Sequence, residues 1–324
     1  MKAIRGITFA PFQRKGTFTK KETKESFDYM LEHTKANFVI FAPSGLQNTA
    51  QSEEICYTSS ATFSDEELRE MIRYAKKKGV GVALKPTVNC KNGVWRAYIS
   101  FFERDVVCEP KWSNWFHSYT DFQIHYAKIA KEEQCEMFIA GCEMVMTEHR
   151  ETEWRHLLAK IREVYDGLLS YNTDKYQEEN ISWWDAVDVI SSSGYYPIDD
   201  WERQLDRIEK VVNQYKKPFF FAEAGCMSRE GSKYVPNNWG LQGKQRLEEQ
   251  VEWYEAMFLA CEKRNWMKGF AMWDWKPIMN TEQEAKKDDG YEICKKPVQE
   301  VIRRFYENKK ESERLFHKEE IKYE

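Results

Sequence analysis

The chain alternates between two patterns of apolar residues. Short, nearly uninterrupted apolar runs are typical of parallel strands buried on both faces, whereas apolar residues spaced three or four apart are typical of amphipathic helices. The short runs predict strands at residues 3–11, 37–43, 80–89, 135–144, 167–172, 186–197, 217–225 and 267–275. The spaced pattern predicts helices at about residues 19–36, 64–79, 113–133, 151–165, 200–215, 244–264 and 297–308.

Alternation of strands and helices indicates an α/β fold, and the count of eight strands favours a closed (β/α)8 barrel, the TIM barrel. An open, doubly wound sheet is the alternative, but it would need a phosphate-binding glycine loop or another switch-point signature. The sequence contains no G-x-G-x-x-G and no Walker motif. We expect a single domain, with the barrel over residues 1–310 and a charged C-terminal tail or helix at 311–324.

Two of the predicted helices begin with a capping box, in which a Ser or Thr is followed three residues later by Glu. These pairs are Thr19 with Glu22 and Ser64 with Glu67. The second helix is expected to stop at Gly79.

Charge and hydropathy exclude several classes of partner. The 49 basic and 53 acidic residues give a net charge of −4, which argues against a nucleic-acid surface. No stretch approaches the 18 apolar residues of a membrane helix, and the N-terminus lacks the apolar core of a signal peptide. We therefore expect a cytoplasmic protein, a monomer or homodimer, that contacts neither membranes nor nucleic acid.

The cysteines and histidines show no metal-binding pattern. None of the eight cysteines forms a C-x-x-C pair, and the six histidines include no H-E-x-x-H motif. A chain of this length needs no disulfide framework, so we expect free thiols and no metal or cofactor. Aromatic residues, by contrast, make up 15% of the chain. This surplus suggests a groove for sugar rings, whose C–H faces stack on indole.

Two glutamates stand out because each follows an apolar run at the end of a predicted strand. Glu143 follows "MFIAGC" and Glu223 follows "FFFA". Strand ends of a (β/α)8 barrel meet at one mouth, where such enzymes place their chemistry. The two carboxylates could therefore lie roughly 5 Å apart, the separation of a retaining glycosidase, with one raised pKa. The alternative is that each glutamate pairs with a buried cation, for which Lys85, Arg5 and Arg96 are available.

Polar and aromatic residues near the other strand ends are candidates for substrate binding. Each has a competing interpretation as a packed wall or loop residue. They are Lys85, Asn89, Trp95, Arg96, Asn172, Tyr195, Tyr196, Trp239, Trp273 and Trp275. One of the two tyrosines could orient the nucleophile through its hydroxyl. Residues 148–150 form either rim groups or, as we favour, a solvated turn.

The order and spacing of several motifs resemble glycoside hydrolase family 113. They are "RGITFAPF", "ALKPTVNCKNGVWRA", "EWRHLLAKIREVYDGLLSYN", "WWDAVDVISSSGYYP" and "KGFAMWDW", which with the two glutamate strands cover Arg5 to about Trp275. That family belongs to the retaining barrel glycosidases and contains endo-β-1,4-mannanases. The resemblance implies that Glu143 is the acid/base and Glu223 the nucleophile, with no cofactor.

The resemblance also implies roles for three further residues. Trp273 matches the strand-eight aromatic platform and Tyr196 matches a strand-six aromatic in the cleft. Cys142 departs from the pattern, because the clan usually has Asn there to bond the sugar 2-hydroxyl, and a thiol is a poor donor. This departure leaves other specificities open, namely xylan, glucan, galactan or exo-action on short oligosaccharides. A sugar-binding barrel without turnover is the non-enzymatic alternative.

Overall fold

Eight parallel strands close into a barrel, in the order β1-β10-β9-β8-β7-β6-β4-β2. The computed structural model describes residues 2–320, and the side chains of residues 2–308. The barrel strands are β1 (Ile4–Phe9), β2 (Phe38–Phe41), β4 (Gly81–Leu84), β6 (Met137–Cys142), β7 (Leu168–Thr173), β8 (Val189–Ser193), β9 (Phe219–Ala224) and β10 (Met267–Trp275). The predicted barrel is confirmed, and the open sheet is wrong.

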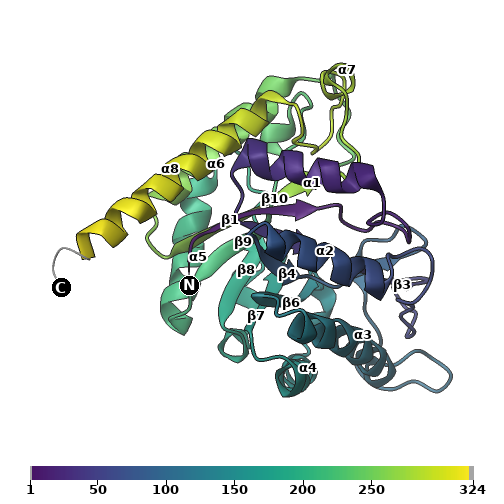
Figure 1. Cartoon of the computed structure of the whole chain (residues 1–324). Coiled ribbons are helices and arrows are strands. Elements are labelled where there is room, and N and C mark those ends of the chain that lie inside the picture. The colour runs from purple at the N-terminus through teal and green to yellow at the C-terminus, as the bar shows by residue number, and fades with distance from the viewer. Residues whose placement is uncertain (1, 321–324) are drawn as a thin grey trace.

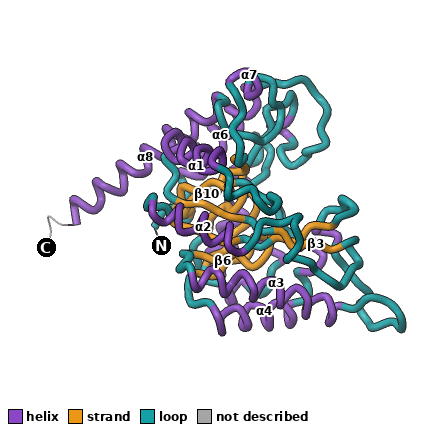
Figure 2. Tube along the Cα trace, turned by 45° about the vertical axis from the view of Figure 1, so that its right-hand side comes forward, coloured by secondary structure: helices purple, strands orange, loops and turns teal. Residues whose placement is uncertain are grey.

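Helices surround the strands, as the purple and orange tubes of Figure 2 show. They are α1 (Lys21–Thr34), α2 (Asp65–Lys77), α3 (Trp112–Glu132), α4 (Glu151–Val164), α5 (Trp201–Tyr215), α6 (Leu247–Glu262), the short α7 (Glu282–Ala285) and α8 (Pro297–Glu320). Alternation is broken once, since β7 and β8 are joined through two 3-10 turns, η3 (Glu178–Asn180) and η4 (Trp184–Ala186). Helix α8 runs outward across position 310, where we expected the barrel to end (Figure 1). Residues 321–324 of the expected tail lie outside the described part of the chain.

The strand predicted at 80–89 is two strands. After β4 the chain leaves the barrel at Pro86, which has no N–H to donate, and continues as β5 (Thr87–Cys90). This strand pairs with β3 (Ser44–Gln47) in a separate two-stranded parallel sheet. The small sheet extends past the ends of β2 and β4, and β3 lies at the right-hand side of Figure 1. It therefore forms a wall beside the mouth of the barrel and carries Asn89 there.

One of the two predicted capping boxes is present. The Ser64 hydroxyl accepts from the backbone N–H of Glu67, and the Glu67 carboxylate accepts from the backbone of Ser64. The other is wrong, because α1 has Lys20 at its N-cap with no side-chain bond, while the Thr19 hydroxyl donates to the Gly16 carbonyl.

The floor of the barrel is apolar. Its filling side chains are Ile4, Phe38, Ile40, Ala83, Met137, Ile139, Val189, Phe220, Ala222 and Ala271. Above this layer the inward positions turn polar, beginning with the bonded pair Ser170 and Ser191. Polar side chains such as Lys85, Ser193 and Glu223 thus follow this layer toward the C-terminal ends of the strands, where a substrate can reach them.

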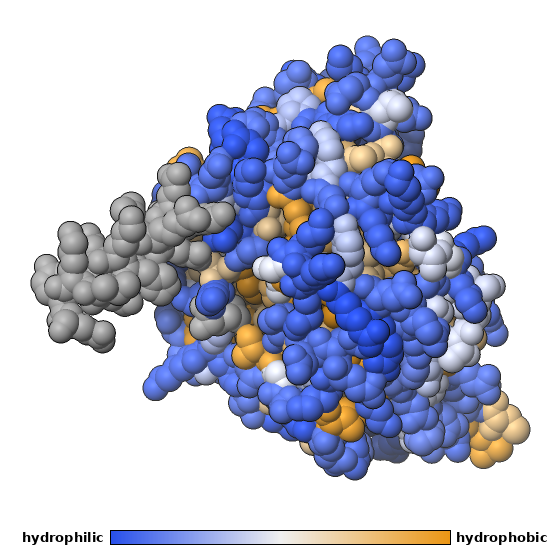
Figure 3. Space-filling view, in the orientation of Figure 1, coloured by the Kyte–Doolittle hydropathy of each residue, from blue (hydrophilic) through white to orange (hydrophobic). Residues whose placement is uncertain are grey.

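The face of the molecule seen in Figure 3 is mostly hydrophilic, as its blue colour shows. The apolar group at the lower right of that view lies over the loop that precedes α3. Among the described residues, no helix combines the length and apolar composition that crossing a bilayer requires.

Candidate active site

Both glutamates sit where the strand ladder is interrupted. The register between β6 and β7 shifts between Ile139 and Cys142, just before Glu143. The register between β8 and β9 shifts between Ser192 and Ser193, opposite Glu223. Such irregularities re-aim a side chain that strict alternation would direct elsewhere. The two irregularities allow residues next to inward-facing positions to face the mouth as well.

The backbone at the end of β6 is also unusual. Gly141 has φ 107°, and a Cβ there would lie 2.2 Å from the hydroxyl oxygen of Tyr119. Glu143 itself has φ 54°, in the left-handed region that non-glycine residues rarely adopt. Its backbone N–H donates to the Asn172 carbonyl at 2.8 Å. A strained backbone of this kind persists only where the surroundings hold it, and it is typical of functional sites.

Glu223 is surrounded by donors. Its Oε1 accepts from Lys85 Nζ at 2.5 Å and from Cys142 Sγ at 3.2 Å, and its Oε2 accepts from the Tyr195 hydroxyl at 3.1 Å. Burial alone would raise the pKa of Glu223, but the charges of Lys85 and Arg96 and the hydrogen bonds outweigh it. The pKa therefore lies below its ordinary value, and Glu223 is ionised at neutral pH.

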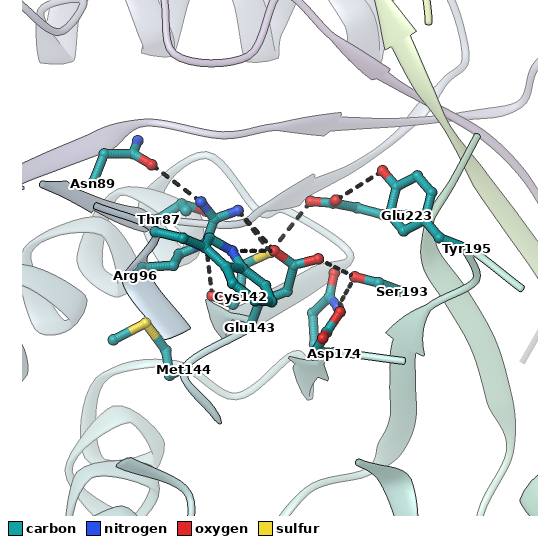
Figure 4. A network of polar contacts seen from close by, with 12 residues as sticks. Thr87, Asn89, Arg96, Cys142, Glu143, Met144, Asp174, Ser193, Tyr195 and Glu223 are labelled. Atoms are coloured by element: carbon teal, nitrogen blue, oxygen red, sulfur yellow. Dashed lines mark hydrogen bonds and ion pairs between the residues drawn. The ribbon is translucent and has the colours of Figure 1, made fainter. Parts of the chain in front are cut away.

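Glu143 has a separate set of partners (Figure 4). Its Oε2 accepts from Trp95 Nε1 and from an Arg96 guanidinium nitrogen, each at 3.2 Å. Its Oε1 accepts from the Ser193 hydroxyl at 2.8 Å. Arg96 also donates to the Cys142 carbonyl and to Asn89 Oδ1, at 3.0 and 3.1 Å. The loop that carries Trp95 and Arg96 is thus fastened over the end of β6.

The two glutamates lie together, as the sequence predicted. Carboxylate oxygens of Glu143 and Glu223 and the Cys142 sulfur all lie within 4.8 Å of one another. The alternative of simple ion pairing is partly correct, since Lys85 and Arg96 pair with Glu223 and Glu143, respectively. It does not account for two carboxylates placed against each other. The same three side chains could offer ligands to a cation, but two cationic side chains already bond these carboxylates.

Several predicted substrate ligands bond the glutamates or their supports instead. Lys85, Cys142 and Asn172 are fully buried. The Asn172 amide accepts from Lys85 at 3.2 Å and donates to Ser193 at 3.1 Å, so it supports the site from within the barrel, and its contact with a sugar stays a prediction. Burial raises the pKa of the Cys142 thiol well above its usual value, and the negative charge of Glu223 adds to this effect. Cys142 therefore stays protonated and donates to Glu223.

The two adjacent tyrosines diverge. Tyr195 is the one that reaches the nucleophile candidate, as its bond to Glu223 shows. Tyr196 is fully buried, and its hydroxyl donates to Glu178 behind the barrel wall. Tyr196 therefore points away from the side of Tyr195, because successive residues of an extended segment point to opposite faces, and its role in the cleft stays a prediction without a supporting contact.

The tryptophans also separate. Trp273 is half-buried beside the mouth, with its ring 5.7 Å from that of Phe12 and 5.8 Å from Lys85 Nζ. Trp275 is fully buried, and its Nε1 donates to Ser26 of α1, so the two indoles do not share a face. Trp239 is 75% exposed on the loop after β9, and its contact with substrate stays a prediction.

Three functional candidates were not predicted from the sequence. Ser193 is one of three consecutive serines in the run "SSSG". The alternation of side chains along a strand could have indicated which of these serines face the inside of the barrel. Asp174 follows β7, and burial together with the charge of Glu143 raises its pKa to about 7. Glu148 was assigned to a solvated turn, yet its side chain is buried. The rest of that turn is more accessible, with His149 and Arg150 pairing with Glu103.

A family model for glycoside hydrolase family 113 matches residues 7–296 of the chain. The chain belongs to glycoside hydrolase family 113. It is therefore a glycoside hydrolase, and the non-enzymatic alternative is set aside. No curated protein sequence matches it significantly.

Solved structures of family 113 are closely similar. A GH113 β-1,4-mannanase is 52% identical, with a TM-score of 0.93 and coverage of 95% of this chain and 99% of the other. The GH113 β-mannanase AaManA from Alicyclobacillus acidocaldarius, in complex with ManMIm, is 39% identical, with a TM-score of 0.92 and coverage of 95% and 98%. A β-glucuronidase from Ruminococcus gnavus, 14% identical with a TM-score of 0.63, covers 94% of this chain and 50% of its own, and shares the fold alone.

The Lys85–Glu223 pair of this family 113 enzyme predicts a pH effect. A nucleophilic carboxylate must be ionised, so kcat/KM falls as the pH drops through its pKa. In Lys85→Met the buried Glu223 carboxylate loses the positive charge that lowers its pKa most, so the pKa of Glu223 rises. We expect the acid limb of the kcat/KM profile to move upward by about 1–3 pH units.

Lys296→Met is the matched control for Lys85→Met. Lys296 is also a fully buried lysine, but its Nζ donates to Asp288 at 2.6 Å. Its loss should lower stability and leave the acid limb in place. An unchanged acid limb in Lys85→Met would contradict the assigned role of Lys85.

Proposed function

We propose that this family 113 enzyme hydrolyses β-1,4-linked mannan and manno-oligosaccharides with retention of anomeric configuration. The observation that carries the mechanism is the approach of the Glu143 and Glu223 carboxylates to within 4.8 Å. Retaining glycosidases hold their two carboxyl groups about 5–5.5 Å apart, whereas inverting enzymes leave about 6.5–9.5 Å for a water molecule.

In the first step Glu223 acts as the nucleophile. Its carboxylate attacks the anomeric carbon and forms a covalent glycosyl ester, while the bond from that carbon to the glycosidic oxygen breaks. Glu143 gives its proton to the departing oxygen. Tyr195 holds the second oxygen of Glu223, and Lys85 favours the ionised state from which the attack starts.

In the second step Glu143, now ionised, takes a proton from water. The hydroxide equivalent attacks the anomeric carbon, the ester bond to Glu223 breaks, and the product has the starting configuration. Arg96, Trp95 and Ser193 bond the ionised form of Glu143 between the two steps. These donors hold the Glu143 carboxylate beside the bond that reacts.

The substrate is proposed from the relatives. Two structures with coverage of at least 98% of their own chains are described as a β-1,4-mannanase and a β-mannanase. Trp273 at the mouth supports stacking of a sugar ring. Cys142, which replaces the expected Asn, bonds Glu223, so the 2-hydroxyl of the sugar needs another partner in this enzyme.

Product analysis tests both parts of the proposal. Manno-oligosaccharides of defined length should be cleaved, and NMR of the first products should show the β-anomer before mutarotation produces the α-anomer. Xylo-, cello- and galacto-oligosaccharides serve as the comparison panel. An initial α-anomer would contradict the double displacement, and a faster reaction with another panel member would replace mannan as the substrate.

A further inference from the structure

Glu148 lies five residues after Glu143, in the turn between η2 (Val145–Thr147) and α4, and the mechanism above does not use it. The residue is 4% exposed. The Tyr171 hydroxyl donates to its Oε1 at 2.6 Å, and the Thr173 hydroxyl donates to the same atom at 2.7 Å. Its Oε2 is buried and has no hydrogen-bond partner.

This unequal distribution of donors fits a protonated carboxyl group. The oxygen of a C=O has two lone pairs, and Oε1 receives two donors. An ionised carboxylate would leave half of its charge on a bare, buried oxygen, which is costly. Burial accordingly raises the pKa of Glu148 to about 8, and the nearby acids Asp174 and Glu178 act in the same direction, while the two hydroxyl donors oppose it.

The charged groups around Glu148 come from several elements and are paired with one another. Asp174, after β7, pairs with Lys175 at 3.1 Å. Glu178, in η3, pairs with Arg207 of α5 at 2.5 Å. Among the described residues, the Glu148 carboxyl accepts hydrogen bonds from two neutral hydroxyl groups, and neither Lys175 nor Arg207 pairs with it to offset a negative charge.

A chain of hydrogen bonds leads from this carboxyl group to the backbone beside Glu143. The Tyr171 hydroxyl, which donates to Glu148, accepts from the backbone N–H of Met144 at 3.1 Å. Met144 directly follows Glu143, whose φ of 54° is a costly conformation. The same turn is fastened by Trp183 Nε1, which donates to the Glu148 carbonyl at 3.0 Å.

We infer that Glu148 is a positioning residue: in its neutral form it orients the Tyr171 hydroxyl, and through it the peptide that sets the direction of Glu143. Glu148 does not touch the reacting atoms. Its ionisation at alkaline pH places a charge beneath this turn and loosens it. The inference rests on the proposed role of Glu143 as the acid/base.

The variants Glu148→Gln, Glu148→Ala and Tyr171→Phe test this inference. Gln keeps a carbonyl oxygen for both donors and cannot ionise, whereas the other two break the chain of hydrogen bonds. With a manno-oligosaccharide at pH 6 we expect kcat to fall about 10- to 100-fold in Glu148→Ala and Tyr171→Phe, with KM within about twofold. Glu148→Gln should retain kcat within about threefold.

Tyr165→Phe is the matched control. It removes another buried tyrosine hydroxyl, which donates to the Cys135 carbonyl at the opposite end of β6. It should lower the melting temperature without changing kcat. If Glu148→Ala does not fold, the comparison of kcat between Tyr171→Phe and Tyr165→Phe still tests the inference. Equal kcat values in these two variants would overturn the inference.

Melting temperature against pH tests the protonation state without any substrate. A carboxyl group whose pKa is about 8 in the folded state and ordinary in the unfolded state binds more protons when folded between these values. Wild-type stability from this group is therefore present at low pH and declines as the pH rises toward 8. The melting temperature of Glu148→Gln minus that of the wild type should therefore increase from pH 5 to pH 8. If this difference does not change with pH, the assignment of a neutral Glu148 is overturned. If the wild type cleaves no mannoside, the proposed function fails, yet this measurement still stands.

Discussion

A Glu223→Ala variant is expected to hydrolyse manno-oligosaccharides on the order of 10⁴- to 10⁶-fold more slowly than the wild type, because the carboxylate that forms the glycosyl ester is gone. Binding should survive, since the donors and Trp273 stay in place. Initial rates with a manno-oligosaccharide, together with calorimetric titration of the same sugar, measure both effects.

A small anion makes the assignment of Glu223 specific. Azide can occupy the space of the missing carboxylate and attack an activated aryl β-mannoside from that side, which gives the α-mannosyl azide. Glu133→Ala is the control, because it removes a buried glutamate that pairs with Arg69 and Arg73 far from the mouth. If Glu223→Ala keeps wild-type turnover, or if azide gives only the β-mannosyl azide, Glu223 is not the nucleophile.

Glu143→Ala should show a loss that depends on the leaving group. With an oligosaccharide the departing oxygen needs a proton, so we expect kcat to fall about 10²- to 10⁴-fold. With an activated aryl leaving group the first step needs no acid, so glycosyl-enzyme should accumulate and give a burst. Stopped-flow release of the aryl group measures this burst.

Azide distinguishes the two glutamates in the Glu143→Ala variant as well. Here it attacks the glycosyl ester in place of activated water and yields the β-mannosyl azide, the opposite anomer from the one expected with Glu223→Ala. The same fractional loss on oligosaccharide and activated aryl substrates would rule out Glu143 as the acid. The pair of variants therefore assigns both roles by product stereochemistry.

The sequence was sufficient to predict the barrel, because each barrel strand is a buried apolar run that requires no knowledge of its neighbours. It was also sufficient for the meeting of Glu143 and Glu223, since closure of eight strands brings their ends to one mouth. It could not show that Thr87 to Cys90 leave the barrel, because only two residues separate β5 from β4 and the partner strand β3 was not predicted.

The neighbours of each side chain were harder to predict than its element. Asn172 and Lys85 were correctly placed at strand ends, but sequence alone could not show that they bond one another rather than sugar. Tyr195 and Tyr196 differ only in the face to which they point, so the sequence could not show which of the two reaches Glu223. Glu148 has an ordinary polar context in the sequence, and its burial follows from Tyr171 and Trp183, which bond it and pack against each other in the folded chain.

The two glutamates are supported by different parts of the chain. The partners of Glu223 come from β4, β6 and the end of β8, which belong to the scaffold itself, whereas Trp95 and Arg96 approach Glu143 from a loop outside it. A substitution in that loop consequently changes the partners of Glu143 directly, whereas it acts on Glu223 only through the charge of Arg96. For protein engineering, the loop is the part of the site to vary, and the strand ends are the part to keep unchanged.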